Sequence, residues 1–253
     1  MSWPVLPVST RRSEISGLSC QVREHPRARH VRLRMDPRLG LVVTVPKGFD
    51  RARLPGLLER RRDWIDAVRE RQTELRREVD PALLGPCPQR VVLPAVERQW
   101  RIDYRPGSGR RLTLRHGPER LVVRLPDMDG SAQEARLAQA LRAWLLARGR
   151  EWLPAWTEQL AAAHGFRYRC VQIRNQRSRW GSCSARGTVS LNARLLFCPP
   201  EVCRYVLIHE LVHTVHPDHS DRFWGAVAEL VPDYRDHSAA LQQTWMRLPQ
   251  WVD

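Results

Sequence analysis

One short segment of the chain has residue types at a spacing suited to metal-dependent hydrolysis. His209 and His213 are four positions apart and Glu210 directly follows the first histidine, which matches the pattern H-E-x-x-H. Residues 205–216 are mostly apolar and contain neither glycine nor proline, so we expect a buried helix. Because positions i and i+4 share a helix face, both imidazoles can bind one Zn²⁺ ion. Glu210 can then act as general base on a metal-activated water.

A catalytic zinc site needs a third protein ligand, and three downstream residues are candidates. His219 comes after a proline that ends the helix and lets the chain turn back. His216 still follows the helix or its end, and Glu229 lies on the next expected helix. Ligand chemistry and spacing favour His219. The predicted metal ligands are therefore His209, His213 and His219.

The competing interpretation of this segment is a core helix whose histidines have no metal to bind. Two unliganded imidazoles and a carboxylate would be costly to bury in so apolar a helix, which favours the metal site. The six cysteines are scattered and form no C-x-x-C pair. This favours free thiols in a reducing compartment, and histidines rather than cysteines as ligands.

Three blocks of the sequence resemble the YgjP-like metallopeptidases, which are zincins related to the SprT-like and WLM proteases. Residues 209–224 resemble the metal-binding signature of that family. Residues 179–184, followed by 189–192, resemble its R-W-G-S-C-S…L-N element, and residues 43–65 contain a weaker match to its N-terminal part. The resemblance implies a zinc-dependent peptidase whose third ligand corresponds to His219. It supplies no natural substrate.

We therefore expect a zinc metallopeptidase of the HExxH type that acts on protein or peptide substrates. The alternative is a nucleic-acid-associated protein with a structural or vestigial zinc site, or a protease acting on DNA-bound protein. Glu210 argues against a purely structural site, which has no use for that carboxylate. The residues that would stabilise an oxyanion or bind substrate are not identified by the sequence, and Arg179 is no more than a guess.

Charge is unevenly distributed along the chain. The net charge is +15, but residues from 201 onward contain four arginines and eight acidic residues, a net of −4, so residues 1–200 carry +19. Between Glu158 and Glu201 there are seven arginines and no acidic residue. Such an excess attracts polyanions, so non-specific nucleic acid is a predicted further partner. No segment reaches the length of a signal peptide or a membrane span, and we expect a cytoplasmic protein with no membrane association.

The pattern of apolar residues predicts an α+β protein with three regions. Residues 1–84 are expected to form a β-rich N-terminal region with a hairpin and one long helix, running from Asp50 to about Val79, after an irregular stretch at 1–20. Residues 85–128 are expected to form an antiparallel β meander, with strands near residues 90–93, 98–105, 110–115 and 119–125. Residues 129–253 are expected to form a zincin-like core with an active-site helix and a small antiparallel sheet.

Within that last region, a capping box at residues 131–134 predicts the start of a long helix that ends at Gly165. The alternating residues 188–192 predict a strand that lies across the metal helix. We expect this strand to be the sheet edge that pairs with an extended peptide substrate. An ordinary hairpin that only covers the helix is the alternative.

Overall fold

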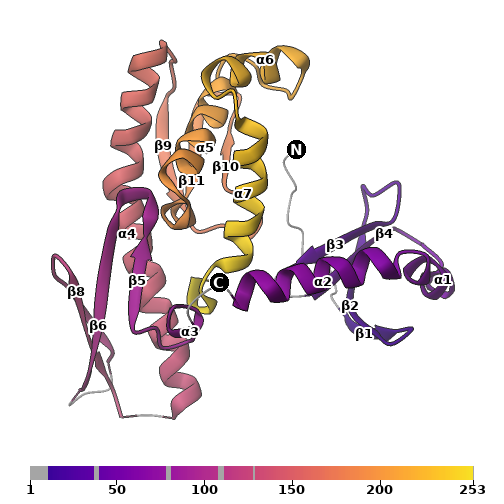
Figure 1. The fold of residues 1–253 in the computed structure, drawn as a ribbon, viewed down its shortest axis with the longest axis horizontal. Coiled ribbons are helices and arrows are strands. Elements are labelled where there is room, and N and C mark those ends of the chain that lie inside the picture. The colour runs from indigo at the N-terminus through magenta and orange to yellow at the C-terminus, as the bar shows by residue number, and fades with distance from the viewer. Residues whose placement is uncertain (1–10, 37–39, 78–80, 108–110, 128, 253) are drawn as a thin grey trace. The chain divides into compact units, whose positions relative to one another are not determined.

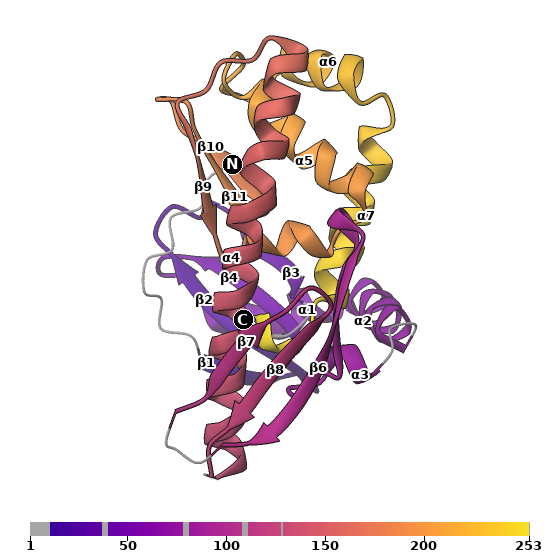
Figure 2. The same cartoon turned by 90° about the vertical axis from the view of Figure 1, so that its left-hand side faces the viewer.

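The computed structural model describes residues 11–36, 40–77, 81–107, 111–127 and 129–252. These form two compact units, unit 1 from Met1 to Glu78 and unit 2 from Val79 to Asp253, each with its own core. Figures 1 and 2 together label the helices and strands of both units. Within the described residues, none of the helices is long and apolar enough to cross a lipid bilayer. The division into three regions at residues 84 and 128 stays a prediction.

Unit 1 is a four-stranded sheet packed against helices. Its elements in chain order are β1 (Arg11–Ile15), β2 (Leu18–His25), β3 (Arg32–Asp36), β4 (Gly40–Pro46), the 3-10 turn η1 (Arg51–Arg53), α1 (Leu54–Glu59) and α2 (Arg62–Arg77). The strand order is β1-β2-β4-β3. Alternate residues of β2 and β4 are buried, and they pack with Leu54, Leu58 and Ile65 of the helices.

Two expectations for unit 1 are wrong. Residues 11–20, predicted to be irregular, form β1 and the start of β2, while residues 1–10 lie outside the described part of the chain. A tight turn at Ser16 and Gly17, with φ of 51° and 71°, lets the two strands pair directly. The helix expected from Asp50 is broken at residues 60–61, so α1 and α2 are separate helices.

Unit 2 begins with a second four-stranded sheet. Its elements are α3 (Pro81–Leu84), β5 (Arg90–Leu93), the 3-10 turn η2 (Pro94–Val96), β6 (Arg98–Pro106), β7 (Thr113–His116) and β8 (Arg120–Leu125). The four strands lie close to their predicted positions, but their order is β5-β6-β8-β7, with β6 parallel to β8. The predicted antiparallel meander is therefore wrong. Residue alternation locates strands, but it does not show which neighbours pair.

The long helix α4 (Gly130–His164) connects this sheet to the rest of unit 2. It starts after Asp129 rather than after Ser131, whose hydroxyl donates a hydrogen bond to the Asp129 carboxylate. It ends as predicted at Gly165, which adopts a left-handed conformation with φ of 71°. Its buried face includes Leu137 and Leu141, both with no exposed surface.

The remaining elements surround the predicted metal helix. They are β9 (Cys170–Arg174), β10 (Gly181–Cys183), β11 (Thr188–Asn192), the 3-10 helix η3 (Ala193–Phe197), α5 (Pro200–Val212), α6 (Asp221–Leu230), α7 (Tyr234–Arg247) and the 3-10 turn η4 (Gln250–Val252). Figure 2 shows the sheet of β9, β10 and β11 beside the C-terminal half of α4. The protein is thus a mixed α+β fold with small sheets.

The predicted role of residues 188–192 as a sheet edge is wrong. The strand order is β10-β11-β9, so β11 is the central strand and β10 is an edge. Val189 and Leu191 of β11 have no exposed surface, because the core of unit 2 covers them. The sheet is also mixed rather than antiparallel, since β11 pairs antiparallel with β10 but parallel with β9.

The contact between α4 and this sheet depends on a glycine. A Cβ atom at Gly149 would lie 2.9 Å from Ile173 Cγ2 and 3.0 Å from Ala193 Cβ. We expect Gly149→Val to lower the free energy of unfolding by about 1–3 kcal/mol through overpacking, measured by urea denaturation. Gly225→Ala in α6 is the control, because a Cβ there meets nothing within 4 Å. A Gly149→Val protein as stable as the control would contradict this account of the contact.

Candidate metal centre

The helix α5 supplies two of the predicted ligands from inside the core. Pro200 at its first turn suits a helix start, because proline has no backbone N–H that would lack a partner there. The helix is buried almost all round, including Leu207, Ile208 and Leu211, which have no exposed surface. A helix covered on every side is rigid, so it fixes the positions of the side chains that it carries.

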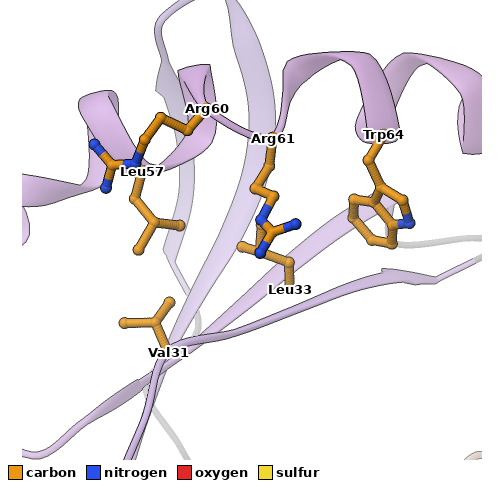
Figure 3. Close-up of a pocket in the computed structure, with 6 residues that line it drawn as sticks. All are labelled: Val31, Leu33, Leu57, Arg60, Arg61 and Trp64. Atoms are coloured by element: carbon orange, nitrogen blue, oxygen red, sulfur yellow. The ribbon is translucent and has the colours of Figure 1, made fainter.

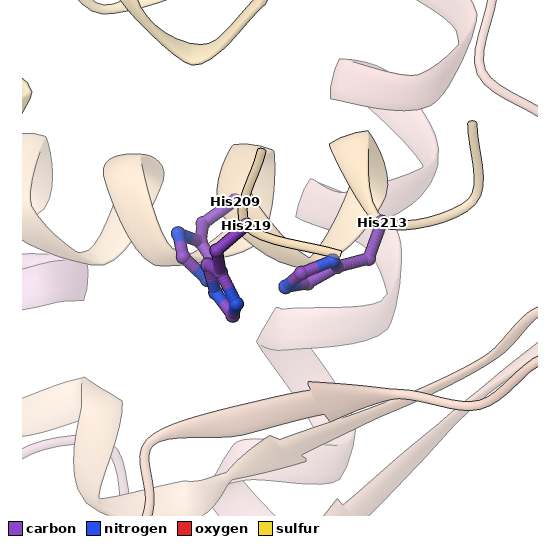
Figure 4. A group of neighbouring side chains, drawn as sticks. All are labelled: His209, His213 and His219. Atoms are coloured by element: carbon purple, nitrogen blue, oxygen red, sulfur yellow. The ribbon is translucent and has the colours of Figure 1, made fainter. Parts of the chain in front are cut away.

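The chain turns back after α5 and brings the third histidine to the first two. The amide of His216 donates to the Val212 carbonyl oxygen over 2.9 Å, which closes the last turn of helix. The segment beyond it then returns, so that His219 Nε2 lies 3.2 Å from His209 Nε2. One ring nitrogen from each of His209, His213 and His219 lies within 4.8 Å of the others, and Figure 4 shows the three rings converging.

Aromatic side chains of α6 support the histidine cluster. The ring of Phe223 has no exposed surface, and its centroid lies 4.4 Å from that of His213 in a stacked arrangement. It also lies 4.8 Å from each of the other two imidazoles. Trp224 packs beside His219, with ring centroids 5.6 Å apart. The rings therefore cannot rotate freely, which keeps their nitrogens directed toward one another.

The surroundings keep the three imidazoles neutral. Burial, with a smaller contribution from the neighbouring histidines, lowers the pKa of His209 to about 3. Burial also lowers the pKa of His213 and of His219. Neutral imidazole is the form that binds a metal ion, so no proton has to be removed from these rings at neutral pH.

The histidine cluster fits the donor set of a zinc site. Four-coordinate zinc with Zn–N distances of about 2.0–2.1 Å places its ligand nitrogens about 3.3 Å apart, close to the 3.2 Å between the Nε2 atoms of His209 and His219. His213 Nδ1 lies 3.0 Å from the His216 carbonyl oxygen, so an N–H there donates to that oxygen and leaves Nε2 for a metal.

The other residues considered as ligands lie outside the cluster. His216 contributes a backbone carbonyl to the ring of His213, and Glu229 is exposed on α6. Cys198 and Cys203 are fully buried, and burial raises the pKa of both thiols. Neither thiol is among the ligand atoms that lie within 4.8 Å of one another, so these cysteines belong to the core.

Glu210 lies on the same helix but has a different environment. Its side chain is only 5% exposed, and its buried Oε2 atom has no hydrogen-bond partner among the described residues. Burial raises the pKa of Glu210 to about 8, and the positive charge of Arg179 acts in the opposite direction. A cation held by the histidines would act in the same direction as Arg179 and favour the carboxylate.

The strand β10 lies directly against Glu210. A Cβ atom at Gly181 would lie 2.5 Å from Glu210 Oε1 and 2.7 Å from its Cγ, so only glycine fits at this position. Cys183 at the other end of β10 is also near the carboxylate: burial, and to a lesser extent Glu210, raises the pKa of its thiol to about 11. That thiol is therefore neutral and not a nucleophile at neutral pH.

A buried asparagine holds the loop that leads into β10. Asn192 has no exposed surface, and its side-chain amide donates to the carbonyl oxygens of Gln176 at 2.7 Å and Arg179 at 2.8 Å. Its backbone N–H donates to the carbonyl oxygen of Trp180 at 2.8 Å. The Asn192 amide thus helps to hold Arg179 and the start of β10 beside Glu210, together with the pairing of β10 with β11.

A second buried side chain, that of Arg194, holds the beginning of the same loop. The guanidinium of Arg194, only 1% exposed, donates to Asn175 Oδ1 at 2.8 Å and to the carbonyl oxygen of Val252 at 2.6 Å. Asn175 donates in turn to the same carbonyl over 3.2 Å. The segment at η4 is therefore part of the support of the site, although it lies far from the site in the sequence.

The sequence singled out Glu210 and the three histidines, which the structure brings together, but it did not single out the residues that support them. Gly181 and Asn192 were within the block that resembles the R-W-G-S-C-S…L-N element, and Phe223 was within the metal-binding signature. No role followed for them, because each acts through contacts between segments distant in the sequence. Trp180 is partly buried against the core of unit 2, with its ring centroid 4.8 Å from that of Trp245.

Comparison with known proteins identifies the class. The model of the YgjP-like metallopeptidase domain matches residues 29–244. The chain therefore belongs to the YgjP-like family of metallopeptidases, whose members depend on a divalent metal ion. It is also similar to the crystal structure of the metallopeptidase zymogen of Pyrococcus abyssi abylysin, with 25% identity over 38% of this chain and 96% of that one and a TM-score of 0.34. No curated protein sequence matches the chain.

The choice of third ligand can be measured directly. We expect the purified protein to contain about one zinc ion per chain, because three neutral imidazoles make an open site. His219→Ala should lower zinc affinity by at least about ten-fold, the size of effect seen even for outer-shell changes. The matched controls His216→Ala and Glu229→Ala should change it little. The measurement is competition with a chromophoric chelator, and the reverse ranking would overturn the assignment.

Proposed function

We propose that the chain is a zinc-dependent peptidase in which His209, His213 and His219 bind the metal ion and Glu210 is the general base. The observation that carries this proposal is the convergence of three neutral imidazoles on one side of α5, next to a buried carboxylate that has no hydrogen-bond partner among the described residues. A peptidase uses such a carboxylate, because it must accept a proton and release it again.

The chain's own residues suit this reaction. When bound, the zinc ion supplies a Lewis acid that polarises the scissile carbonyl and makes water more acidic. Glu210 accepts the proton of the attacking water and donates it to the leaving amine. Burial makes Glu210 more basic while Arg179 favours its ionised form, so the two influences together set its proton affinity.

We further propose that β10 binds the substrate. Among the strands that the structure describes, β10 is an edge of its sheet, and Gly181 places it against the catalytic carboxylate. An extended peptide can pair with the unpaired backbone groups of an edge strand, which gives affinity without demanding particular side chains. The sequence predicts this role for residues 188–192, but that strand is central in the sheet, so we propose the neighbouring edge strand β10 instead.

A structural zinc site in a nucleic-acid-associated protein is the alternative. Structural sites are closed by four protein ligands, whereas within the described residues the cluster here has three. The buried Glu210 would also be costly in a site without chemistry. Both features favour the peptidase.

The first test is Glu210→Gln. The amide keeps the shape of the side chain but cannot accept a proton, so zinc content should remain at the wild-type level while hydrolysis of an unfolded protein substrate falls at least about 100-fold. Cleavage is followed by mass spectrometry of the products. Equal cleavage by both proteins would show that Glu210 is not the general base. If the wild-type protein cleaved no peptide in a proteome-derived library, the proposed peptidase function would be excluded.

The second test is Gly181→Ala. The added Cβ must displace the carboxylate or β10, and small misplacements of a reacting group are costly, so kcat/KM should fall about ten- to 100-fold with zinc content unchanged. Gly225→Ala again serves as a control, since its Cβ has open space. If Gly181→Ala left kcat/KM at the control's level, β10 would not lie against the working carboxylate.

A further inference from the structure

The aromatic side chains of the basic segment before α5 are only partly exposed. Tyr168 and Trp180 both pack against the core of unit 2, so each offers a ligand less surface than an exposed ring does. Within the described residues, the one exposed aromatic side chain is Trp64 of α2, which is 42% exposed. Unit 1, which carries it, is not used by the proposed peptidase site, so a separate role has to be considered.

Trp64 lies in a groove of about 430 Å³ between the helices and the sheet edge of unit 1. The groove, which we call the Trp64 groove, is lined by Val31, Leu33, Leu57, Arg60, Arg61 and Trp64. Figure 3 shows Leu57, Arg61 and Trp64 extending from the helices toward the strands, with Val31 and Leu33 facing them. Its volume is within the range of about 300–1,000 Å³ typical of small-ligand sites.

Unit 1 has the same strand topology as the first sheet of unit 2. In both, four strands form two antiparallel hairpins joined by a central parallel pair, β2 with β4 and β6 with β8, and a helix follows the last strand. In the second hairpin of each sheet, Leu33 is opposite Val43 in unit 1 and Leu114 is opposite Val123 in unit 2. The two modules can therefore be compared strand by strand.

In unit 2 the space between this hairpin and the helix is filled. Trp144 of α4 donates from Nε1 to His116 Nδ1 over 3.0 Å, and its ring centroid lies 5.1 Å from that of Trp100. Trp152 lies 6.0 Å from the same Trp100 ring. In unit 1, Trp64 has no such aromatic partner among the described residues, and the space is open. The helix face beside the second hairpin is thus accessible in unit 1 but buried in unit 2.

The groove combines apolar walls with positive charge. Arg60 and Arg61 are exposed and have no carboxylate partner among the described residues, whereas the neighbouring Arg62 is paired with Glu59 at 2.9 Å. Among the described residues, no acidic side chain lines the groove. Residues 1–78 contain 18 arginine and lysine residues and 10 acidic residues, a net charge of +8. The ligand that complements this surface is an anion with flat apolar groups.

We propose that the Trp64 groove binds single-stranded nucleic acid, with a base stacked on Trp64 and phosphates paired with Arg60 and Arg61. Guanidinium groups bind phosphate through two parallel hydrogen bonds, and an indole stacks on any base irrespective of sequence. Duplex fits less well, because its bases are already stacked on one another and cannot cover the indole. This proposal goes beyond the peptidase function and does not depend on it.

The experiment measures the affinity of the full-length protein for a fluorescein-labelled 12-nucleotide oligothymidylate at several salt concentrations, by fluorescence anisotropy. Wild type should bind it more tightly than the matched oligothymidylate–oligoadenylate duplex. Trp64→Leu, which keeps an apolar side chain, should weaken binding about ten-fold with little change in salt dependence. The pair R60S/R61S should weaken binding and lower the slope of log affinity against log salt by about 1.4, about 0.7 for each lost phosphate contact.

Matched variants separate the groove from general charge. R51S/R53S removes two exposed arginines of the same unit outside the groove and should leave affinity within about three-fold of wild type. R174S/R177S/R186S tests the basic segment before α5 and should also have little effect. Unchanged zinc content and thermal unfolding show that each variant is folded.

Several outcomes would overturn the proposal. These are no binding at low salt, wild-type affinity in Trp64→Leu, equal losses in the two arginine pairs of unit 1, or a loss confined to the R174S/R177S/R186S variant. Duplex binding as tight as single-strand binding would overturn it too. So would displacement of the oligonucleotide by polyglutamate at equal charge concentration, which would point to an acidic peptide as the ligand.

Discussion

The structure of the site depends on burying one carboxylate beside three imidazoles. Glu210 is 5% exposed and its Oε2 atom has no hydrogen-bond partner among the described residues, an arrangement that costs folding free energy. The surrounding elements keep it there: α5 is enclosed in the core, β10 approaches without a side chain at Gly181, and Asn192 holds the loop before β10. Stability given up at one residue in this way is typical of a functional site.

Much of the site was predictable because its central signal is local. The spacing of His209 and His213 on a helix and the proline before His219 are properties of eleven consecutive positions and need no knowledge of the fold. The supports were not predictable, since the contact of Gly181 with Glu210 and the bonds from Arg194 to η4 join segments far apart in the chain. Neither composition nor periodicity indicates that Gly181 is needed because the Glu210 carboxylate lies against it.

Most elements of unit 2 were predictable, but their pairing was not. Alternating residues located β5 to β8 to within a few positions, but the parallel pairing of β6 with β8 and the central place of β11 follow from long-range packing. For the same reason, the sequence did not show that the two four-stranded sheets share one strand topology. One module carries α4 toward the metal centre with its tryptophans buried, while the other leaves Trp64 exposed. The two sheets thus share one strand topology but differ in whether their neighbouring tryptophan side chains are buried or exposed.

X-ray absorption at the zinc edge, on protein loaded with one zinc ion per chain, tests the central claim most directly. Three histidine ligands and an open fourth position predict a shell of about four nitrogen or oxygen neighbours at about 2.0–2.1 Å. Outer-shell scattering should correspond to three imidazoles, which should become two in His219→Ala. A sulfur neighbour at about 2.3 Å, or four imidazoles, would show a closed structural site and contradict the assignment of this centre to hydrolysis.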